Sequence, residues 1–352
     1  IEVYPVNFFI KLIVFLFILG SLQLTCREAQ AKKLKFIRDA ETESGIRALI
    51  TPLLQSAGLE NDSVNIYIVN DPTLNAFVAG GPNIFLHTGL LATSGSASQL
   101  IGVLAHEIGH ISGGHLSKLA AARKLASNEA LVGTILGGAA SILLGNQSAG
   151  TAIVSGGQHV GTRNLLRFSR TQELSADRAA IRYLDATKQS AQGMLDFMEL
   201  LNNQELLNLG NQDPYVRTHP PNQQRINFLQ SYIKSSPYSN VPSNKHFREI
   251  HGRIKAKIRA FIQPPHQTLR EFPASDESVN ARYAKTIANH RIPDQKAALS
   301  LIDGLLAELP NNPYFHELKG QILFENGYAK KALTSYEKAV ELLPRNALFR
   351  AD

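Results

Sequence analysis

The sequence has one cysteine and no tryptophan. The cysteine, Cys26, lies in an N-terminal segment that we expect to be removed on export, and the residues before it fit a lipidation signal poorly. The mature chain then has no thiol, which excludes disulfide bonds, thiol catalysis and thiolate metal sites. Any metal in this chain must be bound by histidine, aspartate or glutamate.

Dense runs of one charge are also scarce, although the net charge is +7 and the pI is about 9.4. The one dense basic group, Arg253, Lys255, Lys257 and Arg259, falls on a predicted helix, where we interpret it as a solvated face. No DNA- or RNA-binding motif accompanies the charge, so we expect no nucleic-acid partner.

Long apolar runs are few. Residues 12–20 are apolar, follow Lys11 and precede an Ala-x-Ala cleavage signal at residues 29–31. This pattern predicts a signal peptide over 1–31 and a periplasmic protein. The alternative is an N-terminal anchor that is not cleaved. Residues 130–145 lack charge but are short for a membrane span. A buried or membrane-surface helix is favoured there, with peripheral membrane contact, over a helix inserted in lipid.

The first half of the mature chain mixes helix and strand signals. Residues 41–58 are amphipathic, and 64–69 alternate as a strand does. Residues 76–79 and 84–87, separated by a Gly-Gly-Pro break, predict a hairpin or two short strands. A capping pattern at Ser96 predicts the start of a long helix.

Helical signals dominate the rest of the chain. Several helices are expected over 165–233, a linker over 235–244, and a helix with one apolar face over 247–261. The fold class is therefore α+β and mostly helical, with a small β-sheet beside the helix that follows Ser96.

The C-terminal part contains an internal repeat with an offset of 34 residues, which is typical of tetratricopeptide (TPR) units. The second unit matches the TPR positions better than the first, and the alternative is a chance helical hairpin. Because solenoids need roughly three repeats, we expect the array to be cut short at residue 352. The matching residues are Ala298, Leu299 and Pro310 in the first unit and Gly320, Ala332, Leu333, Tyr336, Ala339 and Pro344 in the second.

The strongest chemical signal is the run His106-Glu107-Ile108-Gly109-His110. Two histidines spaced i, i+4 on a helix project from one face, close enough to bind one zinc ion. The glutamate between them is placed to take a proton from water at the metal.

The third ligand decides the class of site. Leu116 stands where a metzincin has its third histidine, and His115 misses that position by one residue. On a continuous helix His115 would point about 100° away, so we expect it to pack or hydrogen-bond. Glu173 and Asp177, also spaced i, i+4, offer one carboxylate for zinc and one for a ligand imidazole.

The HEIGH run, His115 and the later SRTQELSAD resemble the CAAX-prenyl-protease-like and HtpX-like gluzincins. More narrowly, an exported HExxH domain followed by TPR units resembles the BepA-type periplasmic proteases. The resemblance covers about residues 40–346 and includes the runs Asn75-Ala76-Phe77, Gly89-Leu90-Leu91, His219-Pro220-Pro221 and Arg225-Ile226.

The resemblance implies one Zn²⁺ per chain. It makes His106, His110 and Glu173 the ligands, Glu107 the general base, and Asp177 an orienting residue or proton donor. His219 becomes an inhibitory fourth ligand or a transition-state donor, and the alternative is a helix-terminal histidine with no role at the metal.

Relatives of this kind pair substrate with a sheet edge, which we expect at Ile84, Phe85 and Leu86. The implied function is a zinc endopeptidase that cleaves misfolded or stalled exported proteins and assists outer-membrane protein assembly. Unfolded outer-membrane proteins are the expected substrates, and the β-barrel assembly machinery is the expected partner of the TPR units. The alternative is a chaperone or scaffold with a latent protease site.

Four segments follow from these patterns. We expect a signal peptide at 1–31, a zinc metallopeptidase domain at 32–240, a connecting helix and linker at 241–279, and TPR repeats at 280–352.

Overall fold

The structure, a computed structural model, describes residues 34–128, 169–205 and 214–350. The expected signal peptide and the apolar stretch at 130–145 lie outside these residues. The chain divides into two compact units, Ile1–Lys35 and Phe36–Asp352, and all elements below belong to the second. Among the residues described, no helix is both long and apolar enough to span a membrane.

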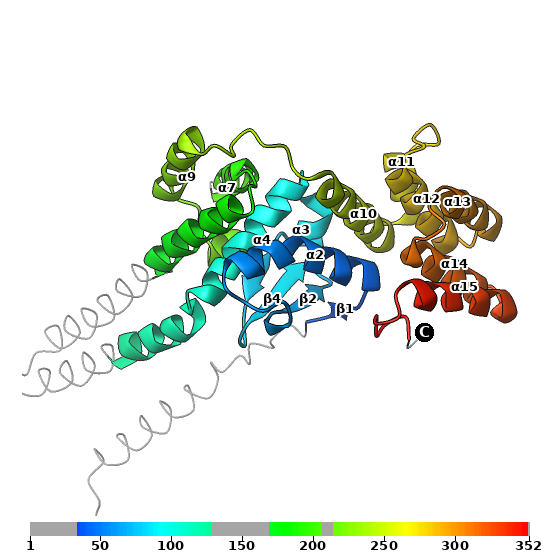
Figure 1. Ribbon diagram of the computed structural model, residues 1–352, viewed down its shortest axis with the longest axis horizontal. Coiled ribbons are helices and arrows are strands. Elements are labelled where there is room, and N and C mark those ends of the chain that lie inside the picture. Colours follow the sequence, from blue (N-terminus) through cyan, green and yellow to red (C-terminus); the bar gives the residue numbers. More distant parts are fainter. Residues whose placement is uncertain (1–33, 129–168, 206–213, 351–352) are drawn as a thin grey trace, which may run out of the picture. The chain divides into compact units, whose positions relative to one another are not determined.

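A mixed four-stranded sheet lies near the start of this unit, in the order β1-β2-β4-β3 (Figure 1). Strands β2 (Asn65–Val69) and β4 (Asn83–His87) are parallel neighbours. Strands β1 (Phe36–Ile37) and β3 (Ala76–Val78) pair antiparallel at the two edges. The strand predicted at 64–69 and the hairpin predicted at 76–79 and 84–87 are confirmed.

The predicted edge strand is wrong. Ile84, Phe85 and Leu86 lie in β4, which is hydrogen-bonded to β2 on one side and to β3 on the other. The β3–β4 hairpin places its second strand inside the sheet because β4 carries the buried Ile84 and Leu86. The edge on this side of the sheet is β3.

Two helices cover one face of the sheet. Helix α2 (Ala40–Ser56) and helix α4 (Ala97–Ser112) share a single core with the inward-facing strand residues. The predicted cap is confirmed, since the Ser96 side chain accepts a hydrogen bond from the Gln99 N–H at 3.2 Å. Leu100, Leu104 and Ile108 repeat every four residues along α4 and are fully buried, which fixes the side of α4 that faces the core.

Further helices surround α4. The short helix α3 (Thr88–Thr93) follows β4, a helix over 115–128 follows α4, and another runs over 169–186. Helix α7 (Gln192–Glu205) packs along α4, and α8 (Pro214–Thr218) and α9 (Gln223–Ser235) complete this part. A 3₁₀ turn, η1 (Asn61–Ser63), precedes β2.

Helix α10 (Lys245–Ile262) joins two hydrophobic cores, because Ile250, Ile254 and Ile258 belong to the first core and Ala256 and Ala260 to a second. The non-helical linker before it is confirmed, as is the apolar face predicted over 247–261.

The basic residues of α10 are not a solvated face, which corrects our interpretation. Lys255 donates to the Ser94 carbonyl and Arg259 to the Ala92 carbonyl, both at 2.9 Å, so they satisfy acceptors at the end of α3. Lys257 is buried. The cluster is basic because it binds carbonyl and carboxylate oxygens of the protein itself.

The last helices form two hairpins after α11 (Pro265–Glu271). They are α12 (Val279–Arg291) with α13 (Gln295–Glu308), and α14 (Pro313–Glu325) with α15 (Ala329–Leu342). Each helix of the second hairpin begins and ends 34 residues after its counterpart in the first. The described part of the chain is thus mostly helical with one small mixed sheet.

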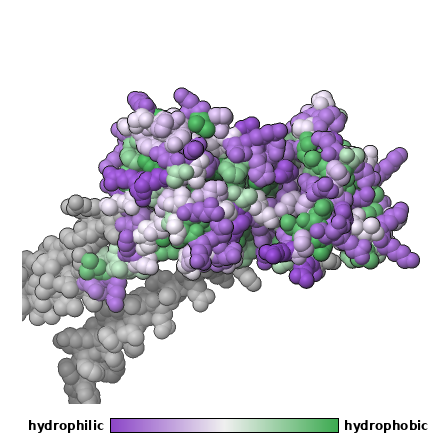
Figure 2. Space-filling view, in the orientation of Figure 1, coloured by the Kyte–Doolittle hydropathy of each residue, from purple (hydrophilic) through white to green (hydrophobic). Residues whose placement is uncertain are grey.

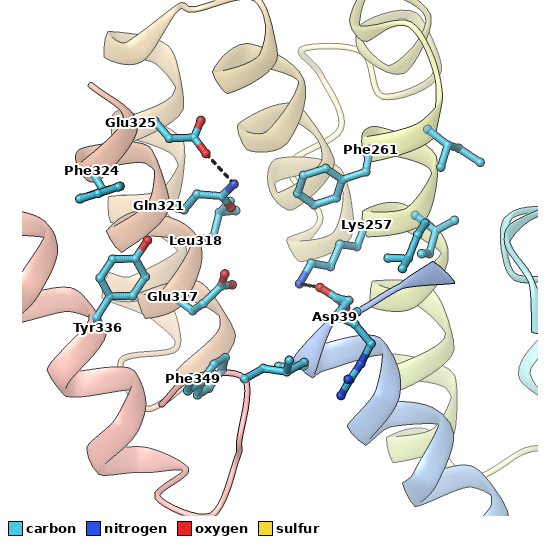
Figure 3. A pocket seen from close by; sticks show the side chains of 16 residues that line it. Asp39, Lys257, Phe261, Glu317, Leu318, Gln321, Phe324, Glu325, Tyr336 and Phe349 are labelled. Atoms are coloured by element: carbon cyan, nitrogen blue, oxygen red, sulfur yellow. Dashed lines mark hydrogen bonds and ion pairs between the residues drawn. The ribbon is translucent and has the colours of Figure 1, made fainter. Parts of the chain in front are cut away.

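A cleft of about 580 Å³ separates α10 and the start of α2 from α14 and α15 (Figure 3). On one wall the Lys257 ammonium reaches Asp39 at 2.5 Å and Glu41 at 3.7 Å. Burial alone would raise the pKa of Asp39, but the charge of Lys257 together with hydrogen bonds from Lys257 and Thr42 outweighs burial and lowers that pKa. The aromatic side chains in this cleft are Phe261, Phe324, Tyr336 and Phe349.

Figure 2 shows mainly hydrophilic side chains over the described residues on this side of the molecule, with hydrophobic ones in separate patches. The exposed apolar residues of the C-terminal hairpins include Phe324, Tyr328 and Leu333.

We predict that Lys257→Met lowers the free energy of unfolding by about 3–5 kcal/mol, because it leaves buried carboxylates without their ammonium partner. Urea denaturation followed by circular dichroism measures this. Lys245→Met is the matched control, since the Lys245 side chain is 84% exposed, and it should change stability by no more than about 0.5 kcal/mol. Equal stability of the two variants would contradict a stabilising role for the buried pair.

Candidate metal centre

Helix α4 brings the first three residues of the site into the protein. His106 is 1% exposed and Glu107 is fully buried, and His110 lies one turn further along the same face. The Nε2 atoms of His106 and His110 are 3.0 Å apart. The i, i+4 spacing therefore brings both imidazoles to one point, as the sequence predicts.

The helix over 169–186 supplies the carboxylates. It packs so closely on α4 that an added Cβ at Gly109 would lie 2.7 Å from the Ala176 carbonyl oxygen. This approach places the Glu173 carboxylate 3.2 Å from His106 Nε2 and 3.4 Å from His110 Nε2. A side chain at position 109 would push the second helix, and with it Glu173, away from the histidines.

His219 joins the same group from a third segment, just after α8. Its Nδ1 lies 3.4 Å from His106 Nε2 and 3.2 Å from both oxygens of Glu173. The ring is held against Tyr215, with 4.7 Å between ring centroids, and the His219 N–H donates to the Tyr215 carbonyl at 2.8 Å.

The four donor atoms fit a metal ion. One atom each from His106, His110, Glu173 and His219 lies within 4.8 Å of all the others. A tetrahedral zinc with bonds of about 2.0–2.1 Å holds its donor atoms about 3.3–3.4 Å apart. The separations given above run from 3.0 to 3.4 Å, close to the edges of such a tetrahedron, with His106 and His110 each nearest to a different oxygen of Glu173.

Asp177 and Arg225 form the support behind His106. Asp177 Oδ1 lies 2.9 Å from His106 Nδ1, which fixes the proton on Nδ1 and turns Nε2 toward the donor set. Arg225 binds Asp177 with two bonds of 2.6 and 2.8 Å and reaches Glu173 at 3.1 Å. Burial would raise the pKa of Asp177, but the charges and hydrogen bonds of Arg225 and His106 together outweigh burial and lower it.

Arg225 also holds the segment that carries His219, since it donates to the carbonyl of His219 at 3.3 Å and to that of Pro220 at 3.1 Å. Sequence reasoning quoted Arg225 only as part of a resemblance and gave it no role. The signal in the sequence that indicates a role for Arg225 is its position on an otherwise apolar helix face, six residues after His219. Tyr215 was missed entirely.

His115 supports His110 from the other side. Helix α4 ends at Ser112, and Gly114 adopts a φ of +61°, a conformation that favours glycine. This turn brings His115 Nδ1 to 3.0 Å from His110 Nδ1. The expectation that His115 hydrogen-bonds is confirmed, although the continuous helix assumed for it is interrupted.

Burial has the largest influence on the pKa of each ionisable group here, and neighbouring groups reverse its direction at His106 but not at Glu107 or His110. Burial opposes protonation of His106, but hydrogen bonds to Asp177 and Glu173 outweigh it and raise the pKa of His106 to about 9. Burial raises the pKa of Glu107. Burial and then the charge of His106 lower the pKa of His110 well below its usual value, which favours the neutral form that binds metals.

Glu107 lies beside the donor set without a hydrogen-bond partner for either buried carboxylate oxygen among the residues described. His219 Nε2 is 3.7 Å from one of these oxygens. Glu107 and His110 both line a cavity of about 520 Å³ that also borders β3 at Phe77 and Val78. A buried carboxylate that faces a cavity and is not used in packing can accept a proton from a bound molecule.

A helix bearing HExxH, a glutamate from a second helix and a sheet edge beside them define the class of HExxH metallopeptidases. The sequence model of peptidase family M48 matches residues 40–233, and the chain belongs to this family.

Individual proteins that are similar to this chain are named as proteases or endopeptidases. The chain is 24% identical over 298 residues to the "Beta-barrel assembly-enhancing protease" of Yersinia pestis, covering 84% of this chain and 61% of the relative. Its counterpart in Escherichia coli (strain K12) is 24% identical over 311 residues, with 87% and 63% covered. The "Mitochondrial metalloendopeptidase OMA1" of Schizosaccharomyces pombe is 23% identical over 218 residues, with 58% and 60% covered. The chain thus spans about three fifths of the length of these relatives.

We predict that His115→Ala weakens zinc affinity about 10- to 100-fold, because His110 loses the acceptor that orients its ring. Competition with a chromophoric chelator measures the affinity. His115→Gln, whose amide oxygen can accept the same proton, should recover most of it, and His246→Ala on the exposed surface is the control. If His115→Ala and His246→Ala bind zinc equally well, His115 does not position His110.

Proposed function

We propose that the protein is a zinc-dependent endopeptidase of the cell envelope that cleaves misfolded or stalled exported proteins. The observation that carries this is the cluster of four metal-ligating side chains, beside which the Glu107 carboxylate has no hydrogen-bond partner among the described residues. Membership of family M48 and the names of the relatives support the same reaction and a link to outer-membrane protein assembly.

In this proposal His106, His110 and Glu173 hold one zinc ion per chain, with His219 as a fourth donor. When bound, zinc supplies Lewis-acid chemistry that polarises the scissile carbonyl. Zinc is favoured over harder cations because three of the four donors are imidazole nitrogens.

Glu107 is the proposed general base. Its free carboxylate takes a proton from the attacking water and passes it to the leaving amine. Of the two roles that the resemblance implies for Asp177, we favour the positioning role. Asp177 is fully buried, its oxygens are used by His106 and Arg225, and its lowered pKa makes it a poor proton donor.

We assign substrate pairing to β3 in place of Ile84–Leu86. The His87 N–H donates to the Asn75 carbonyl, and the Ala79 N–H donates to the Asn83 carbonyl, so residues 75, 77 and 79 direct their backbone groups toward β4. The backbone groups of Ala76 and Val78 then point away from β4, beside the cavity. An extended polypeptide can hydrogen-bond there with little dependence on its sequence.

A second candidate function is a chaperone or scaffold whose protease site is latent. The observation that favours latency is the position of His219 Nδ1 within the donor set, where a fourth protein ligand would occupy the place that water needs. We propose that His219 closes the resting site, and that activity requires its departure.

The C-terminal hairpins are proposed to be TPR units that dock the protein on the outer-membrane β-barrel assembly machinery. Their identical 34-residue offset supports this, as does the approach of Tyr336 to Gly320, where an added Cβ would lie 2.9 Å from the ring.

We retain the four proposed segments, 1–31, 32–240, 241–279 and 280–352, and a periplasmic location with unfolded outer-membrane proteins as substrates.

We predict that Glu107→Gln lowers cleavage of an unfolded exported protein about 10²- to 10⁴-fold, the range for loss of a general base. Zinc content should remain at one ion per chain, because Glu107 is not among the donors. Glu60→Gln, an exposed change, serves as the control. Cleavage by Glu107→Gln at the wild-type rate would show that the peptidase assignment is wrong.

We predict that His219→Ala raises the initial cleavage rate of the zinc-loaded protein, because removing the fourth donor opens the site. Initial rates with a quenched fluorescent peptide, at saturating zinc, measure this. A large fall in kcat with unchanged KM would instead identify His219 as a transition-state donor and would rule out the closed resting site.

A further inference from the structure

The outer face of the sheet carries a continuous row of aromatic side chains, one from each strand. Phe77 stacks on Phe85 and Phe85 on Tyr67, with 5.0 Å between ring centroids in both pairs, and Tyr67 lies 5.9 Å from Phe36. We call Phe36, Tyr67, Phe85 and Phe77 the aromatic row. It crosses β1, β2, β4 and β3 in that order.

The aromatic row plays no part in the hydrophobic cores of the described chain. Its strand neighbours Ile37, Ile66, Ile84 and Val78 point to the opposite face and pack in the first core, whereas no member of the row does. Phe36 is 50% exposed and Tyr67 38%. Phe77 and Phe85 are half-buried, and a contiguous apolar patch of this kind on a protein surface marks a binding site.

The row is continuous with the candidate metal centre. Phe77 belongs to the row and also lines the cavity that contains Glu107 and His110. The adjacent backbone of Ala76 and Val78 is the edge assigned to substrate. A polypeptide paired with β3 therefore runs beside the Phe77 ring, and its continuation can turn across the strands along the row.

The chemistry of this face favours a polypeptide over a charged lipid surface. The other residues of β2 and β4 on this face are Asn65 and Asn83, whose uncharged side chains bond each other at 2.9 Å, and Val69 and His87, which are buried at the far ends of the strands. Stacked rings with uncharged amides suit aromatic and aliphatic side chains. Membrane β-barrels place aromatic girdles at alternating strand positions, so their unfolded chains are rich in such segments.

We propose that the aromatic row is an exosite that binds aromatic segments of the polypeptide substrate outside the cleavage cleft. This inference rests on the proposed peptidase function and adds selectivity for aromatic-rich unfolded chains. Four strands spaced by about 4.8 Å span about 15 Å, which an extended chain covers with about five residues. Substrates that carry aromatic residues this far from the cleaved bond gain the extra contacts.

The test uses two synthetic peptides of equal length with the same cleavable core. One continues into a segment with alternating Tyr and Phe, and the other has Ser at those positions. The wild-type protein should cleave the aromatic peptide with a KM about ten-fold lower, the gain expected from two aromatic contacts. In Tyr67→Ser/Phe85→Ser this preference should disappear, whereas Tyr328→Ser, an exposed tyrosine of the C-terminal hairpins, should keep it.

Binding to Glu107→Gln protein, measured by fluorescence anisotropy with the same labelled peptides, separates the exosite from the peptidase function. If the wild-type protein cleaves neither peptide but the aromatic one binds more tightly through Tyr67 and Phe85, the exosite stands and the peptidase proposal fails. The single variant Tyr67→Ser, checked by circular dichroism, guards against misfolding of the double variant and should lose part of the preference.

Three outcomes would overturn the exosite. The first is equal KM and equal binding of the two peptides in the wild type. The second is a preference that survives in both Tyr67→Ser and the double variant. The third is an unchanged peptide preference in these variants together with the loss of another interaction. Loss of binding to phosphatidylcholine vesicles would assign the row to lipid, and loss of self-association would assign it to a second copy of the chain.

Discussion

The Arg225 guanidinium is the shared cationic partner of two buried carboxylates, each of which would be costly to bury without one. It binds Asp177 with two bonds, reaches Glu173, and holds the carbonyls of His219 and Pro220. Through these contacts one cation from α9 fixes the second helix, the ring of His106 and the segment of His219. The donor atoms lie within 4.8 Å of one another because these three segments meet at the buried Arg225.

The sheet provides a second level of organisation, since its two faces have different tasks. The inner face packs on α2 and α4 and so fixes the helix that carries the histidines. The outer face carries the aromatic row, which ends at the cavity beside β3. Because successive residues of a strand point to opposite faces, the same short strands can hold the metal centre in place and present a surface for substrate.

The sequence predicted local features well. The HExxH helix, its Ser96 cap, the strands and the 34-residue offset all follow from short-range periodicity and spacing. Features that depend on packing between distant parts of the chain were missed or wrongly predicted. The order of strand pairing places Ile84–Leu86 inside the sheet. The turn at Gly114 places His115 next to His110. The basic residues of α10 bind oxygen atoms at the ends of α2 and α3. Arg225 had no assigned role because the carboxylate that it binds with two bonds, Asp177, lies 48 positions away in the chain.

The tetrahedral donor set is tested most directly by X-ray absorption at the zinc edge of the zinc-loaded protein. Nitrogen and oxygen neighbours at about 2.0–2.1 Å, with the outer-ring scattering of three imidazoles, are expected. That scattering should fall to two imidazoles in His219→Ala and stay at three in the surface variant His246→Ala. Two imidazoles in the wild type, with no change in His219→Ala, would contradict the four-donor site.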